Sequence, residues 1–283
     1  MKHHITKILY IQFVSFGDVL VSTQIIRKLK EKHPNSEIHY YTTTPCVPLL
    51  MKNPDISFVF TERYPPASFE FYDVVLRPYR ALQMSGGWHL SGKHFMDIYA
   101  EICGVDLEKD YFGYFYNIEE FKIPYSKYIL IQCKTNDSAK DYDRFGELVS
   151  QINKKIKLPV IQIGSPTDPI IEGAAEFLPL PWPKTAYLVS KAVTTVCLDS
   201  AVQHLACALN APHIALYGPK DKEMVQSSKR ILFEYQYGLE PENRNGCKVP
   251  CNLAVCQNPL GKCINNISPE WITELIDKTM QGE

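Results

Sequence analysis

Four features that mark common protein classes are missing from this sequence. Its 30 Lys and Arg against 31 Asp and Glu give a formal net charge of −1, so the basic excess typical of a general nucleic-acid binder is absent. No apolar run approaches the roughly 18 to 20 residues that span a bilayer. The first residues lead into a strand-like stretch instead of a signal-peptide core. No Gly-x-Gly-x-x-Gly follows the first predicted strand, which argues against a Rossmann oxidoreductase. We therefore expect a soluble, cytoplasmic protein without a nucleic-acid partner.

The composition itself is that of an ordinary globular protein. Hydrophobic residues make up 45% of the 283 residues and charged residues 22%, which excludes a disordered or fibrous chain. At roughly 100 to 200 residues per domain, this length favours two domains. Five of the nine cysteines stand singly in apolar surroundings, as reduced core cysteines do: Cys46, Cys103, Cys133, Cys197 and Cys207.

Short β-branched runs alternate with amphipathic helical runs, which predicts an α/β fold with mainly parallel sheets. A first series predicts strands at 8–13, 38–42, 57–60 and 72–76 and helices at 19–32, 47–52 and 93–103, with a break at Gly86 and Gly87. A second predicts strands at 128–132, 160–163, 194–198 and 213–219 and helices at 144–156, 185–191, 202–209 and 269–280. We therefore predict two Rossmann-like domains, 1–124 and 125–283, joined at 122–126. They would face a central cleft where ligands bind at strand carboxyl ends.

The first predicted strand runs into Ser15, Gly17 and Asp18, and a helix follows at once. Glycine in such a turn lets backbone N–H groups approach a ligand, and a helix N-terminus favours an anion. Asp18 then has two interpretations. It is either an N-cap carboxylate, which contributes about 0.5 to 2 kcal/mol to helix stability, or a general base at the floor of the cleft.

A second polar turn follows the strand at 194–198. Asp199 ends that strand, Ser200 can cap the next helix, and His204 lies one turn further along. Their polar groups converge on one helix end that favours an anion. A single His on such a helix is more often a core residue, but the neighbouring Asp-Ser pair favours a ligand site here.

The remaining cysteines cluster with the spacing Cys-x3-Cys-x4-Cys-x6-Cys, at Cys247, Cys251, Cys256 and Cys263. Four thiolates so close in sequence suit a structural Zn or Fe site. The missing Cys-x2-Cys pair, together with Pro250 and Pro259, favours a structural loop that is reduced or partly disulfide-linked.

Several motifs recur in one order along most of the chain. They are Ser15-Phe16-Gly17-Asp18-Val19-Leu20, Asn53-Pro54-Asp55, Asp199-Ser200 with His204-Leu205-Ala206, Tyr217-Gly218-Pro219-Lys220-Asp221, the cysteine segment, and Ile267-Ser268-Pro269-Glu270. In this order and spacing the chain resembles the ADP-heptose:lipopolysaccharide heptosyltransferase family, glycosyltransferase family 9, which has the two-domain GT-B fold.

The resemblance implies an inverting glycosyltransferase that moves a heptose from ADP-heptose to a lipopolysaccharide core or a related cell-envelope saccharide, with no cofactor required for catalysis. The family's base maps onto Asp18, in the turn with Ser15 and Gly17. Its donor-binding Asp and His map onto Asp199 and His204, with Ser200 beside them.

The family's lysine that neutralises the donor diphosphate maps onto Lys140, with Lys134 as a competing candidate. A cation is needed there because ADP leaves as an anion. Ala201 stands where the family often has Gly, and its amide can still donate to the diphosphate. Asp168 is the nearest match to an acidic residue that follows the Gly-Ser-Pro turn.

The family is usually longer, and the first domain is abbreviated between Leu76 and Lys93, on the acceptor side. Two alternatives therefore stay open: an autotransporter-type heptosyltransferase that modifies protein, and a non-catalytic module that binds a sugar nucleotide. The end of the first helix is basic, which indicates either a solvated helix end or a peripheral contact with the inner membrane surface. Its cations are Arg27, Lys28, Lys30, Lys32 and His33.

Overall fold

The computed structural model describes residues 6–13, 15–84, 92–107, 112–226, 235–251 and 253–282. Along these residues the chain divides into two compact units, with the break between Asn117 and Ile118. Glu119 already belongs to the second unit, because its N–H donates to the Pro183 carbonyl at 3.1 Å and its Oε1 lies 3.2 Å from Lys184 Nζ. The domain boundary after residue 124 stays a prediction. Gly86 and Gly87 lie outside the described residues.

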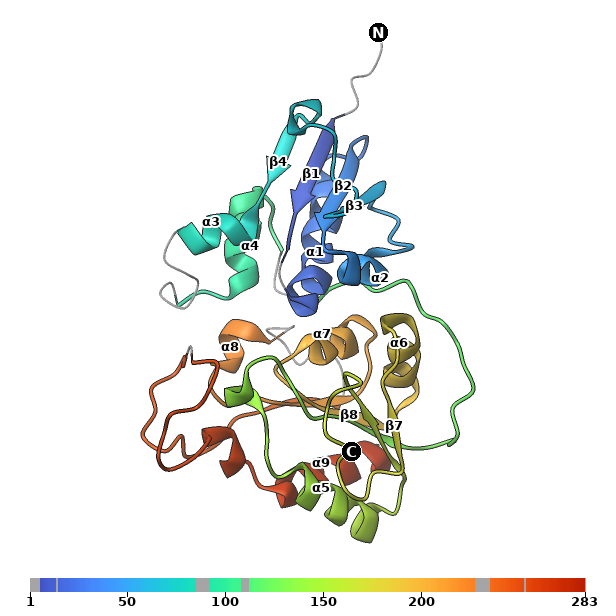
Figure 1. The fold of residues 1–283 in the computed structure, drawn as a ribbon, viewed down its shortest axis with the longest axis vertical. Coiled ribbons are helices and arrows are strands. Elements are labelled where there is room, and N and C mark those ends of the chain that lie inside the picture. The colour runs from blue at the N-terminus through green and yellow to red at the C-terminus, as the bar shows by residue number, and fades with distance from the viewer. Residues whose placement is uncertain are drawn as a thin grey trace. The chain divides into compact units, whose positions relative to one another are not determined.

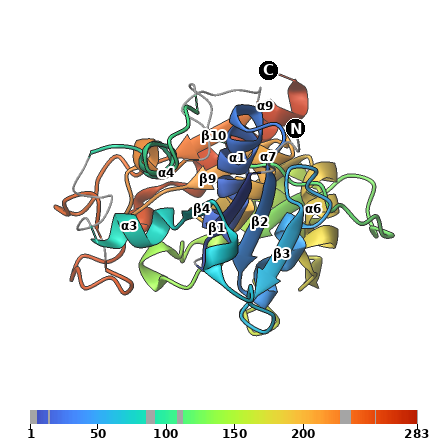
Figure 2. The same cartoon turned by 90° about the horizontal axis from the view of Figure 1, so that it is seen from above.

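The first unit contains a parallel sheet in the order β3-β2-β1-β4 (Figures 1 and 2). Its strands and helices are β1 (Lys7–Ile11), α1 (Phe16–Lys32), β2 (Glu37–Thr42), α2 (Val47–Leu50), β3 (Phe58–Thr61), β4 (Val74–Leu76), α3 (Pro78–Met84) and α4 (Phe95–Cys103). In β2, buried residues alternate with half-buried ones, the pattern of a strand with one face toward the core. Helix α1 packs beside α2 and α4 and buries Val19, Leu20 and Ile25.

The second unit contains a larger parallel sheet in the order β10-β9-β8-β5-β6-β7. Its elements are β5 (Ile129–Gln132), α5 (Phe145–Gln151) with a π-helical turn (Ile152–Ile156), β6 (Val160–Ile163), β7 (Glu176–Leu178), α6 (Trp182–Lys191), β8 (Thr194–Leu198), α7 (Ala201–Ala208), β9 (His213–Leu216), α8 (Lys222–Val225), β10 (Gln236–Leu239) and α9 (Pro269–Gln281). Every residue of β5, β6, β8 and β9 is buried. Parallel strands covered on both faces bury all their side chains in this way, and α5 and α9 lie on one side of the sheet with α6 and α7 on the other (Figure 1).

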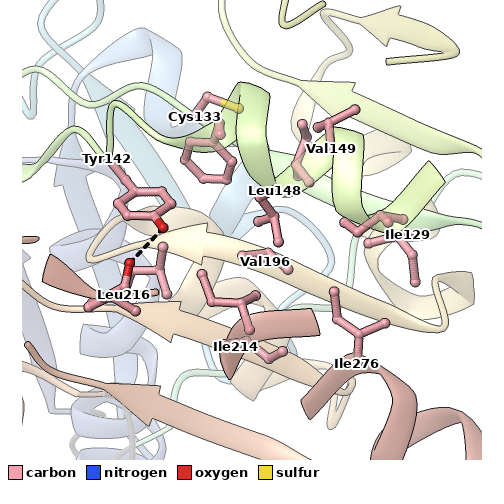
Figure 3. Packing of buried hydrophobic residues seen from close by; sticks show 14 of the residues in the cluster. Ile129, Cys133, Tyr142, Leu148, Val149, Val196, Ile214, Leu216 and Ile276 are labelled. Carbon is pink, nitrogen blue, oxygen red and sulfur yellow. Dashed lines mark hydrogen bonds between the residues drawn. The ribbon is translucent and has the colours of Figure 1, made fainter. Parts of the chain in front are cut away.

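The core of the second unit lies between its sheet and the pair α5 and α9. Figure 3 shows Ile129, Val196 and Ile214 from three neighbouring strands packed together with Leu148 of α5 and Ile276 of α9. The hydroxyl of Tyr142, itself 2% exposed, donates to the Ile267 carbonyl at 2.7 Å. This packing holds the central strands rigid, and their carboxyl ends carry the polar residues described below.

The predicted strands and helices are present with bounds shifted by a few residues, and four short elements appear that the pattern does not predict: α3, β7, α8 and β10. Strands β7 and β10 lie at the two edges of the larger sheet. Each pairs with one neighbour and is only partly buried, so no continuous apolar run marks it in the sequence. Helix α8 is a single turn started by Asp221, whose carboxylate accepts from Glu223 N at 2.9 Å.

Candidate active site

The turn after β1 presents Asp18 within the first turn of α1. Ser15 is the N-cap residue of this helix, so the interpretation of Asp18 as the N-cap is wrong. The Ser15 hydroxyl donates to Asp18 Oδ2 at 2.5 Å. A carboxylate in the first turn is stabilised by the helix dipole, and Asp18 is only half-buried. The turn therefore holds an ionisable group that is oriented and still reachable.

Two buried residues outside any sequence motif form a hydrogen-bonded chain that ends on Asp18. The Tyr99 hydroxyl, from α4, lies 3.3 Å from Asp18 Oδ1 and donates to it, and Gln12 Nε2 donates to the same hydroxyl at 3.3 Å. Each of these two side chains is only 1% exposed. Burial, and then the charge of Asp18, raise the pKa of Tyr99 far above its ordinary value, so Tyr99 stays a hydrogen-bond donor at all physiological pH values.

We expect Tyr99→Phe to lower kcat roughly tenfold and to move the acid limb of the pH–kcat profile to higher pH. A hydrogen bond to a charged group contributes about 1.5 to 3 kcal/mol, and its loss disfavours the ionised carboxylate. The profile is measured under saturating substrates. Tyr142→Phe is the matched control, because it removes another buried tyrosine hydroxyl that lies in the second unit. If the acid limb stays in place, or moves equally in the control, Tyr99 does not stabilise the ionised Asp18 carboxylate.

In the second unit, polar residues gather where β5, β8 and β9 end side by side. Ser200 is the N-cap of α7, and its Oγ accepts from Val202 N at 3.3 Å. The same hydroxyl donates to Gln132 Oε1 at 2.9 Å, and that oxygen also accepts from Leu198 N at 3.2 Å. The buried Gln132 thus ties the end of β5 to the turn after β8. Its place at the end of a buried strand is the sequence signal that could have identified it.

The two candidate lysines have different partners. Lys140 Nζ lies 2.8 Å from Asp199 Oδ2 and 3.4 Å from the Asp199 carbonyl oxygen. Lys134 Nζ instead lies 2.5 Å from Asp141 Oδ2, and the Asp141 side chain is 3% exposed. Thus Lys140 joins Asp199 and Ser200 in one cluster, whereas the charge of Lys134 is matched by a buried carboxylate of its own loop.

Lys220 also belongs to this cluster, although sequence reasoning assigned it no role. It follows the turn after β9 and is half-buried. Burial lowers its pKa and the nearby charge of Lys140 lowers it further, while Asp199 acts in the opposite direction. Two lysine side chains therefore lie within electrostatic range of Asp199.

The other predicted donor-side residues divide between this cluster and a separate turn. Ala201 is the first residue of α7. His204 lies one turn further and is 7% exposed, with its N–H 3.5 Å from the Ser200 carbonyl. Asp168 serves the turn after β6, where its Oδ2 accepts from Ser165 N at 2.9 Å. A Cβ on Gly164 would lie 2.3 Å from that oxygen, so a larger residue there would displace the Asp168 carboxylate.

Cations at the end of α1 have partners within the first unit. Arg27 Nε lies 2.5 Å from Asp55 Oδ2, and Lys28 Nζ lies 3.0 Å from Glu31 Oε2. Lys30 donates to the Ser36 carbonyl and Lys32 to that of Gly104, both at 2.6 Å. Among the described helices, none combines the length and apolarity needed to cross a membrane.

The sequence profile of glycosyltransferase family 9 (heptosyltransferase) matches residues 106–251, just over half of the chain. The chain belongs to glycosyltransferase family 9. It is therefore a glycosyltransferase. The matched range of this family 9 enzyme includes Lys140, Asp199, Ser200, His204 and Lys220, while the Asp18 turn lies before it.

Solved structures show the same fold as this family 9 enzyme, the GT-B fold with two Rossmann-like domains. A glycosyltransferase family 9 protein from Veillonella parvula is 15% identical, with a TM-score of 0.72 over 100% of this chain and 99% of that one. The iron-containing dodecameric glycosyltransferase TibC from enterotoxigenic E. coli is 15% identical, with a TM-score of 0.73 over 98% and 77%. E. coli ADP-heptose LPS heptosyltransferase II is 18% identical, with a TM-score of 0.70 over 98% and 99%. No curated protein matches by sequence.

TibC is described as iron-containing. In this family 9 enzyme the candidate metal ligands are the four cysteines of the cysteine segment. None of the nine cysteines, all of which lie within the described residues, forms a disulfide. Across the described part of the chain, no three His, Cys, Asp or Glu side chains are grouped so that they could hold a metal ion. The cysteines as placed do not fit a tetrahedral site.

Proposed function

We propose that this enzyme transfers a heptose from ADP-heptose to a hydroxyl of a cell-envelope saccharide, with inversion at the anomeric carbon. The observation that carries the proposal is the ion pair of Lys140 and Asp199 at the N-terminal end of α7. In support, TibC was solved in complex with ADP-D-β-D-heptose and E. coli WaaC with ADP.

The second unit is proposed to bind the donor. As the bond between the anomeric carbon and the diphosphate oxygen breaks, its electron pair stays on the oxygen and ADP gains negative charge. Lys140 and the backbone N–H groups at the start of α7 can meet that charge, since preorganised cations and helix N-termini stabilise a developing anion. Asp199 orients Lys140 from one side and the sugar hydroxyls from the other. His204 lies one turn along the same helix.

The first unit is proposed to supply the base. The acceptor oxygen forms the new bond to the anomeric carbon from the face opposite the leaving diphosphate, which inverts that carbon. Its proton passes to the Asp18 carboxylate. Hydrogen bonds from Ser15 and Tyr99 to the two carboxylate oxygens favour the ionised form that the step requires.

The cysteine segment is proposed to act as a structural loop. Cys251 N donates to the Pro219 carbonyl at 2.6 Å, immediately before Lys220. Asn258 Nδ2 donates to Cys247 Sγ at 2.9 Å. The first contact braces the loop that follows β9 and the second holds the segment itself together, so the segment supports the donor-side cluster through the backbone.

A panel of nucleotide sugars tests the donor. We expect ADP-heptose to raise the melting temperature of the protein more than UDP- or GDP-sugars do, because a ligand that binds only the folded state stabilises it. Transfer is then followed as ADP release with saccharide acceptors, and the anomeric configuration of the product is read by NMR. A retained configuration would contradict inversion. Transfer to a protein, seen by intact mass, would replace the saccharide acceptor.

A further inference from the structure

Lys220 is brought to the donor-side cluster by sheet topology. Strands β8 and β9 pair in parallel with Leu198 opposite Leu216, and Asp199 N donates to the Leu216 carbonyl at 3.2 Å. The turn that follows β9 is held at two carbonyls: Arg244 Nη1 donates to Gly218 at 2.5 Å and Cys251 N to Pro219 at 2.6 Å. The backbone that carries Lys220 is therefore held at the carboxyl ends of the strands, as is the turn after β5 that carries Lys140.

The same turn is tightly packed. A Cβ on Gly218 would lie 2.6 Å from the Cβ of Ile264, a core residue with no exposed surface. Tyr217, one residue earlier, is 1% exposed, and its N–H donates to the Leu239 carbonyl of β10 at 2.8 Å. Packing and backbone hydrogen bonds therefore fix the position of the backbone from which the Lys220 side chain leaves.

The charges that face Lys220 come from three elements. Lys140 and Asp137 lie at the 3-10 turn after β5, Asp199 ends β8, and Cys251 belongs to the cysteine segment. The two carboxylates raise the pKa of Lys220, but burial and the charge of Lys140 outweigh them and lower it. In the free protein the Lys220 ammonium is thus held at an electrostatic cost that an incoming polyanion would relieve.

We propose that Lys220 is a second cationic contact for the donor diphosphate, which makes this site select a nucleoside diphosphate over a monophosphate. The inference rests on the proposed function. The charge of Lys140 is shared with Asp199 at 2.8 Å, so one lysine alone does not balance a diphosphate. A second ammonium supplies the missing charge, both in the bound donor and as ADP departs.

The test is calorimetric binding of ADP and of AMP to the full chain. We expect Lys220→Gln to weaken ADP binding roughly tenfold, which corresponds to the loss of about one charge-assisted contact. The affinity for AMP should change by less than about twofold. Lys220→Arg keeps the charge and should keep most of the ADP affinity. Lys222→Gln is the matched control, since Lys222 lies two residues further along, in α8, and its Nζ lies 3.9 Å from Oε2 of Glu240, the residue after β10. Thermal unfolding verifies that each variant is folded.

Alkaline pH supplies a second readout. Because the pKa of Lys220 is lowered, its ammonium begins to lose its proton at a lower pH than an ordinary lysine. ADP affinity of the wild type should therefore fall as the pH rises through that range, and Lys220→Arg should flatten the fall.

The outcomes distinguish failure of the inference about Lys220 from failure of the proposed function. An equal loss of ADP and AMP affinity in Lys220→Gln, or no loss, overturns the inference even when transfer is intact. If the wild type binds ADP more tightly than AMP and Lys220→Gln loses this difference, the inference about Lys220 is upheld. This holds even if no heptose is transferred and the proposed function fails. If the wild type binds neither ADP nor another nucleoside diphosphate, both are overturned.

Discussion

Asp18→Asn should reduce heptose transfer by roughly a thousandfold or more while leaving donor affinity within about twofold of the wild type. Positioned general bases contribute about 10² to 10⁴-fold to a rate, and an amide of the same shape cannot take the acceptor proton. The Ser15 hydroxyl can still donate to the amide oxygen, so the turn should keep its conformation. Transfer is measured as ADP release and donor affinity by calorimetry.

The control for Asp18→Asn lies in the same helix. Glu31→Gln removes a carboxylate of α1 that pairs with Lys28, 3.0 Å away on the helix surface, and it should leave transfer unchanged. If Asp18→Asn retains a tenth or more of wild-type turnover, Asp18 is not the base. If it loses donor binding as well, the residue acts on the donor instead.

Lys140→Met should both destabilise the second unit and weaken binding of the donor. The Asp199 side chain is 9% exposed and its carboxylate pairs with Lys140 at 2.8 Å, so the variant leaves a buried charge without its partner. Loss of one member of a buried pair costs about 3 to 5 kcal/mol. Donor affinity should fall by at least about tenfold, since a charge-assisted contact to the diphosphate is lost. Urea unfolding and calorimetry measure the two effects.

A double variant separates these effects of Lys140. Lys140→Met combined with Asp199→Asn removes both charges and should recover most of the lost stability, as expected for two residues in contact, while donor affinity stays low. Lys134→Met is the matched control, because it leaves the equally buried Asp141 without its ammonium. It should be destabilised in the same way and keep its donor affinity. Full donor affinity in Lys140→Met would remove this lysine from the site.

Most of the fold could be predicted because its central strands are local hydrophobic runs. β5, β6, β8 and β9 are buried along their whole length, so each shows in the sequence without knowledge of its neighbours. The edge strands β7 and β10 could not be predicted, because they are only partly buried and so lack a continuous apolar run that would mark them in the sequence.

The candidate site divides in the same way. Asp18, Asp199 and Ser200 follow strands directly and precede helices, so their position at strand carboxyl ends could be predicted from local pattern. Tyr99 could not, since it is 81 residues away from the carboxylate that it contacts. Gln132 likewise reaches Ser200 over 68 residues.

By itself, then, the amino-acid sequence determined the α/β class, the resemblance to glycosyltransferase family 9 and the two polar turns, because each depends on residues that are neighbours along the chain. Only the tertiary structure decided that Lys140 pairs with Asp199 while Lys134 pairs with Asp141, and that Lys220 joins the first of these pairs. An ion pair is set by the distance between side chains on separate segments, and those distances exist only once the parallel strands have brought their carboxyl ends together.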